Sequence, residues 1–146
     1  DYGRSFPERY LWLQAGHFPD SRACFVFSRA SMPMLGGEFD GFFAYLSDFN
    51  NFSARFATYN RSKLVRWTVD VEQRTCSGEL SGPDGRLVFS AKMAGGGRLR
   101  APVDGLMNRE IIESITAQVE VSLYDRRDHL IFEAASTEAG MEICLD

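Results

Sequence analysis

The chain has 146 residues, of which 45% are hydrophobic and 25% charged, and its formal net charge is −4. This length and composition are typical of one globular domain with a single core. The basic residues are scattered and no apolar run approaches the roughly 20 residues of a membrane-spanning helix, so we expect no nucleic-acid partner and no transmembrane segment.

Short runs rich in β-branched and aromatic residues follow one another along the chain. The predicted strands are Tyr10–Ala15, Arg22–Ala30, Phe39–Ser47, Phe52–Tyr59, Leu64–Val71, Thr75–Leu80, Arg86–Met93, Thr116–Tyr124, Leu130–Ala135 and Met141–Leu145. Tight turns separate them, the strongest being the segment 82–85, Gly-Pro-Asp-Gly. Strands of this length and spacing indicate an all-β fold, either an antiparallel sandwich or a barrel.

Alternation within the predicted strands indicates which side chains are buried. In Leu64–Val71 the residues Val65, Trp67, Val69 and Val71 share one face, and we expect that face to pack on the core.

The segment MAGGGRLRAPVDGLMNREI, residues 93–111, resembles a phosphate-binding loop at first sight. It lacks the Lys-Ser or Lys-Thr pair of such a loop, and Pro102 favours an extended Ala101 instead of a helix start. We therefore expect a long crossover that leaves the sheet at Met93 and re-enters it after Ile111. Residues Asn108–Ile115 fit a short helix or the start of the next strand equally well.

Three carboxylates interrupt apolar runs: Asp40 in GGEFDGFF, Glu133 in LIFEAAS and Glu142 in GMEICLD. A carboxyl group surrounded by hydrocarbon has a raised pKa, which suits it to donate a proton to an apolar substrate. The three residues are therefore candidate proton donors. The alternative is that strand alternation simply points Glu133 and Glu142 into water.

The sequence contains no motif for a metal, a cofactor or a nucleophilic triad. His17 and His129 are isolated, and the three cysteines have no ligand spacing. We expect no metal, no cofactor, and free thiols in a reducing compartment. The expected location is cytoplasmic, with peripheral membrane association as the alternative.

Three segments resemble, in the same order, successive signatures of the tocopherol cyclase family: PERYLWLQAGHF (residues 7–18), GGRLRAPVDGLMNREIIESI (96–115) and IFEAASTEAGMEI (131–143). The resemblance covers the C-terminal half of the family's length. Residues 1–146 are therefore expected to form a single β-barrel-like domain, the C-terminal half of a longer two-part protein. The resemblance implies a lipocalin- or calycin-like β-barrel or a strongly curved sandwich, with at most one short helix and an apolar pocket.

For its plant members the resemblance implies an intramolecular cyclase, an isomerase that closes a chromanol ring on a prenylated quinol. An acid protonates the alkene of the prenyl tail, and aromatic faces stabilise the resulting cation. Under this hypothesis Asp40, Glu133 or Glu142 donates the proton. The expected substrate-binding residues are Phe43, Tyr45 and Trp67 along the pocket, with Arg98 and Arg100 at its rim.

Two other functions fit the same sequence. The chain could be a non-catalytic carrier or sensor of hydrophobic small molecules, or a purely structural β-domain whose rings fill the interior. We expect an apolar small molecule as the partner. The face that the missing N-terminal half would cover is expected to form a homodimer or to pack against that half.

Overall fold

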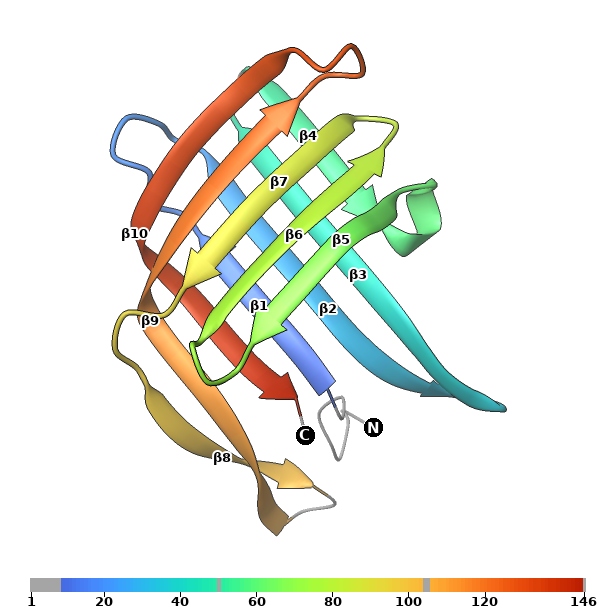
Figure 1. The fold of residues 1–146 in the computed structure, drawn as a ribbon, viewed down its shortest axis with the longest axis vertical. Helices are drawn as coiled ribbons and strands as arrows, with labels where there is room; N and C mark the ends of the chain where they lie inside the picture. Colours follow the sequence, from blue (N-terminus) through green and yellow to red (C-terminus); the bar gives the residue numbers. More distant parts are fainter. Residues whose placement is uncertain (1–8, 50, 104–105, 146) are drawn as a thin grey trace.

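The computed structural model describes residues 9–49, 51–103 and 106–145, which form one antiparallel sheet (Figure 1). The predicted all-β fold is thus confirmed. The strands are β1 (Arg9–Ala15), β2 (Cys24–Met34), β3 (Gly37–Asp48), β4 (Phe52–Ala57), β5 (Lys63–Asp70), β6 (Thr75–Gly82), β7 (Gly85–Lys92), β8 (Gly97–Val103), β9 (Leu106–Tyr124) and β10 (Leu130–Leu145). The only helical element in the described residues is the 3₁₀ helix η1 (Thr58–Asn60). No helix in this part of the chain is long and apolar enough to span a membrane.

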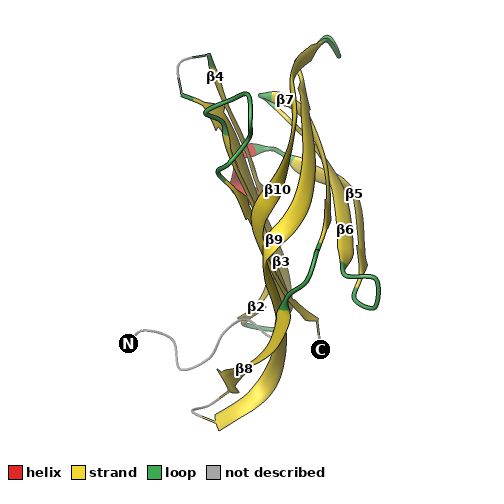
Figure 2. Ribbon diagram, turned by 90° about the vertical axis from the view of Figure 1, so that its left-hand side faces the viewer, coloured by secondary structure: helices red, strands yellow, loops and turns green. Residues whose placement is uncertain are grey.

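The sheet is strongly curved but does not close. Its strand order is β4-β3-β2-β1-β10-β9-β7-β6-β5, with β8 paired to β9, so β4 and β5 are the two ends of the order. The curvature brings the two halves of the sheet face to face as two layers (Figure 2). At the β4 end, the Arg55 backbone N–H donates a hydrogen bond to the Asp84 carboxylate in the β6–β7 turn, 2.9 Å away.

Aromatic rings join the two layers through the interior. Phe27 on β2 contacts Phe89 on β7 with ring centroids 4.6 Å apart, and it contacts Trp67 on β5 at 5.3 Å. A second group of rings fills one end of the interior, where Phe132 lies 5.3 Å from Phe52 and 6.2 Å from Phe18. Inward-facing aliphatic residues of both layers complete this core.

The glycine-rich segment forms a hairpin and not the expected crossover. Residues 97–103 are strand β8, which pairs with the first half of β9, whereas the second half of β9 pairs with β7. The short helix considered for Asn108–Ile115 is wrong, because these residues lie within β9. Leu130–Ala135 and Met141–Leu145 are likewise parts of one strand, β10, whose pairing with β9 shifts register near Ala139.

The expected burial of Val65 and Val71 with Trp67 is also wrong. A register shift between Leu64 and Arg66 places a bulge at Val65, which is 54% exposed. Leu64 packs against the core instead, together with Trp67 and Val69. Val71 follows the end of β5 and is exposed.

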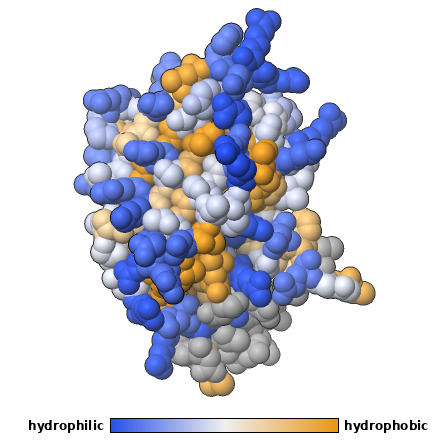
Figure 3. All heavy atoms as spheres, in the orientation of Figure 1, coloured by the Kyte–Doolittle hydropathy of each residue, from blue (hydrophilic) through white to orange (hydrophobic). Residues whose placement is uncertain are grey.

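The opposite face of β5, β6 and β7 carries hydrophilic residues (Figure 3). Glu79 on β6 is paired with Arg66 on β5 and with Arg86 on β7, and Arg86 is also paired with Asp128. The rings of Phe89 and Trp67 lie on the inner side of these strands, in or against the core.

Gly78 tests the ring packing, because it faces Phe89 directly across the β6–β7 pair. A Cβ atom at Gly78 would lie 2.6 Å from Phe89 Cε1, and the buried ring has no space to withdraw. We expect Gly78→Ala to lower the free energy of unfolding by about 1–3 kcal/mol in urea denaturation. The control is Gly97→Ala, where a Cβ meets nothing within 4 Å; an equal or smaller loss for Gly78→Ala would contradict this packing.

Candidate functional site

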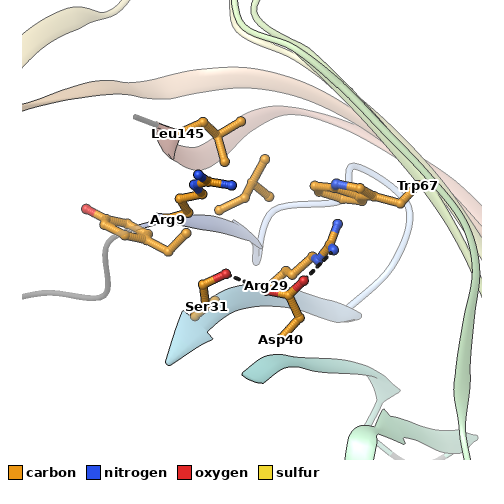
Figure 4. A pocket seen from close by; sticks show the side chains of 9 residues that line it. Arg9, Arg29, Ser31, Asp40, Trp67 and Leu145 are labelled. Atoms are coloured by element: carbon orange, nitrogen blue, oxygen red, sulfur yellow. Dashed lines mark hydrogen bonds and ion pairs between the residues drawn. The ribbon is translucent and has the colours of Figure 1, made fainter. Parts of the chain in front are cut away.

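A cavity of about 170 Å³ lies between the layers, where β1 begins and β10 ends (Figure 4). This end of the sheet is opposite the one filled by Phe18, Phe52 and Phe132. The described residues that line it are Arg9, Tyr10, Leu11, Arg29, Ala30, Ser31, Asp40, Trp67 and Leu145. Five strands therefore contribute to one small site, and Trp67 comes from the layer facing the others.

A hydrogen-bonded polar cluster forms one wall of the cavity. Ser31 on β2 and Asp40 on β3 are directly paired in register, and the Ser31 hydroxyl donates to Asp40 Oδ1. Arg29 Nη2 donates to the other carboxylate oxygen, Asp40 Oδ2, at 3.2 Å. The Ser31 hydrogen bond and the Arg29 charge outweigh burial and hold the pKa of the Asp40 carboxyl below its usual range.

The lowered pKa reverses the chemistry expected of Asp40. A proton donor to an alkene must be protonated at neutral pH, whereas Asp40 is an ionised hydrogen-bond acceptor. Its side chain is 54% exposed, so the hydrocarbon surroundings expected from GGEFDGFF do not enclose it. The neighbouring phenylalanines lie along the strand, and the carboxylate instead meets Ser31 and Arg29.

Trp67 forms the opposite wall. The guanidinium carbon of Arg29 lies over the indole at 5.4 Å from the ring centroid, close enough for a cation–π contact. Phe27 packs against the same indole from inside the core. The Trp67 ring is thereby held between the filled core and the cavity.

Glu142 and Glu133 do not line this cavity. Glu142 lies opposite Trp12 on the outer face of the sheet and accepts a hydrogen bond from the Tyr10 hydroxyl at 3.3 Å. Burial, and then the Glu142 charge, raise the pKa of the Tyr10 phenol. Glu133 is exposed, and its carboxylate is 3.4 Å from the Ser122 hydroxyl.

The predicted substrate-binding residues are distributed over three places. Trp67 lines the cavity, whereas Phe43 and Tyr45 lie on the opposite face of β3, paired with Ser28 and Val26. Arg98 and Arg100 are exposed on β8, away from the cavity, and Arg98 is paired with Glu110 at 2.8 Å. The structure thus brings together Trp67 and Asp40 from the predicted set.

Sequence reasoning missed Arg9, Arg29 and Ser31. The predicted second strand ended at Ala30, so that Ser31 fell outside it. A usable pattern was present, because polar Arg29 and Ser31 alternate with Ala30 along β2. Pairing them with Asp40 required the register of the hairpin. The described residues contain no group of three or more His, Cys, Asp or Glu placed to hold a metal ion.

The role of Ser31 can be measured through the ionisation of Asp40. In Ser31→Ala the carboxylate loses the hydrogen bond that does most to lower its pKa, so we expect the pKa of Asp40 to rise toward the usual range. Because this pKa is lowered in the folded chain, the ionised carboxylate stabilises the fold above the unfolded pKa, and this stabilisation is lost as pH falls through the lowered value. The measurement is the pH dependence of the Asp40 carboxyl ¹³C shift. Ser77→Ala, on the other face of the sheet, is the control; an unchanged midpoint in Ser31→Ala would contradict the assignment.

Comparisons of the chain with known protein families, curated proteins and solved structures found no match. The resemblance to the tocopherol cyclase family therefore stays a prediction based on three segments. Those segments contribute to β1, to β8 and β9, and to β10, and β1, β10 and β9 are neighbours in the sheet.

Proposed function

We propose that the chain is a non-catalytic binding module for a small molecule with a hydroxylated ring. The observation that carries this proposal is the cavity in which the Arg29–Ser31–Asp40 cluster faces the Trp67 indole. A hydroxyl group both donates and accepts hydrogen bonds. The Asp40 carboxylate accepts and the Arg29 guanidinium donates, so this pair complements a hydroxyl in both directions.

The ring of such a ligand would lie among apolar atoms of the remaining wall. Leu11, Leu145 and the Trp67 indole supply this surface. A ring packed beside an indole gains stacking energy beyond simple burial. The headgroup of a prenylated quinol, which the resemblance implies, meets this description.

The dimensions of the cavity support binding of a headgroup only. Pockets that enclose a drug-sized ligand typically have about 300–1,000 Å³, against about 170 Å³ here. The interior beyond Trp67 is occupied by the fully buried Phe25, Phe27 and Phe89. An apolar tail would therefore have to leave through the open end of the cavity.

The geometry favours binding over acid-promoted ring closure. Of the three candidate acids, only Asp40 lines the cavity, and its pKa is shifted in the direction that removes the proton. Alkene protonation requires a carboxylic acid as donor. A carrier or sensor role needs only the complementary contacts already described.

The proposal is tested by fluorescence quenching of Trp67. The Trp12→Phe background removes the other indole, which lies on the outer face of the sheet. Methylhydroquinone should quench Trp67 in a saturable manner, and its dimethyl ether should bind at least about tenfold more weakly, because hydrogen bonds to charged groups contribute about 1.5–3 kcal/mol. Arg29→Met should weaken methylhydroquinone binding to a similar extent.

The control is Arg66→Met, which removes an exposed arginine on the outer face of β5 and should leave binding unchanged. Equal affinity for the ether, or quenching that does not saturate, would contradict the proposed site. The non-catalytic part is tested separately with a prenylated hydroquinone. Formation of a chromanol faster than in protein-free buffer would overturn it.

A further inference from the structure

A groove of about 560 Å³ lies on the outer face of the β2–β3 hairpin. Met32, Phe39 and Phe43 line it from the hairpin, and Tyr59 of η1 lines it as well. The cross-strand pairs Met32–Phe39, Ala30–Gly41 and Ser28–Phe43 place these residues on one face. Arg29 and Asp40 alternate with them and face the end cavity, so the groove and the cavity occupy opposite faces of one hairpin.

Gly41 forms part of the floor of this groove. A Cβ atom there would lie 3.1 Å from Met32 Cε and 3.4 Å from Phe39 Cε1. The absence of a side chain therefore lets Met32 and Phe39 pack over Gly41, in the space that a larger residue would need. Both side chains stay partly exposed, Met32 at 44% and Phe39 at 38%.

The groove contains little polar chemistry. None of its described lining residues carries a charge. The Thr58 hydroxyl is already bonded to the backbone of Phe42, accepting from its N–H at 2.9 Å and donating to its carbonyl oxygen at 3.3 Å. Ser28 and Tyr59 carry the other hydroxyls of the described lining. An ionic ligand would lose its hydration here without a compensating partner.

These features point to a small molecule as the occupant. The volume lies within the range of about 300–1,000 Å³ that small-molecule pockets occupy, and such pockets are concave and mostly apolar. A stable protein partner instead covers about 800 Å² and roughly 20–30 residues on each side, whereas nine described residues line this groove. We propose that this groove binds one small, uncharged, predominantly apolar molecule. The proposal does not depend on a ligand in the end cavity.

The experiment uses N-phenyl-1-naphthylamine, an uncharged fluorophore whose emission rises in apolar surroundings. We expect saturable binding of one molecule per chain. Gly41→Leu would fill the floor and should weaken binding at least about tenfold, which corresponds to about 1.4 kcal/mol. Tyr59→Ser removes one wall and should weaken binding severalfold. The matched control is Phe49→Ser, which removes another exposed ring, 76% exposed, in the β3–β4 turn.

Circular dichroism and thermal melting establish whether each variant is folded. If Gly41→Leu does not fold, the binding affinity of Tyr59→Ser tests the proposal instead. Arg29→Met separates the groove from the end cavity, because it should leave naphthylamine binding unchanged whether or not the hydroquinone binds. The proposal is overturned if Phe49→Ser weakens binding as much as Tyr59→Ser, or if Arg29→Met abolishes it. If the chain dimerises through the groove, the dimer excludes the fluorophore, and dilution that dissociates the dimer in sedimentation restores fluorophore binding. That result would assign the groove to a second copy of the chain and would also overturn the proposal.

Discussion

The contact of Phe27 with Phe89 and Trp67 is the interaction on which the rest of the structure depends. Phe27 comes from β2, which is far from β7 and β5, the strands of Phe89 and Trp67, in the strand order of the single sheet. Because hydrogen bonds join only neighbouring strands, they leave the overall curvature of an open sheet undetermined. Burial of these rings between the two layers supplies the reason for the sheet to fold over on itself.

The filled interior decides where ligands can bind. Four phenylalanines are among the fully buried side chains, and they occupy the space that an internal lipid pocket would need. The middle of the domain is therefore filled by side chains. Space remains at the open end beside Trp67 and on the outside of the β2–β3 hairpin. Both spaces depend on that hairpin, because its side chains alternate between two faces. Arg29 and Asp40 lie on the face of the end cavity, and apolar residues such as Met32 and Phe39 lie on the face of the groove.

Several expectations were wrong for identifiable physical reasons. The three isoleucines near residue 112 fit helical and strand periodicities alike, and the pairing of Ile112 with Arg98 on β8 and with Ile143 on β10 selects the strand. Gly95 and Gly96 adopt positive φ between β7 and β8, and β8 then pairs with the first half of β9 in the same direction as β7 pairs with its second half. Val65 points outward because a bulge shifts the alternation by one residue, and no side-chain pattern in the segment marks that bulge.

The sequence alone determined the fold class, the approximate positions of most strands, and the presence of Asp40 and Trp67 as unusual residues. These follow from local properties: β propensity, turn chemistry and alternation act over a few residues. The tertiary structure decided that the sheet stays open, that Arg29 and Ser31 join Asp40, and that Glu133 and Glu142 lie elsewhere. These outcomes depend on strand register and on contacts between layers, which join residues distant in sequence. The ionisation of Asp40 depends on them too, because its pKa follows from hydrogen bonds across the β2–β3 pair and not from its apolar neighbours in the chain.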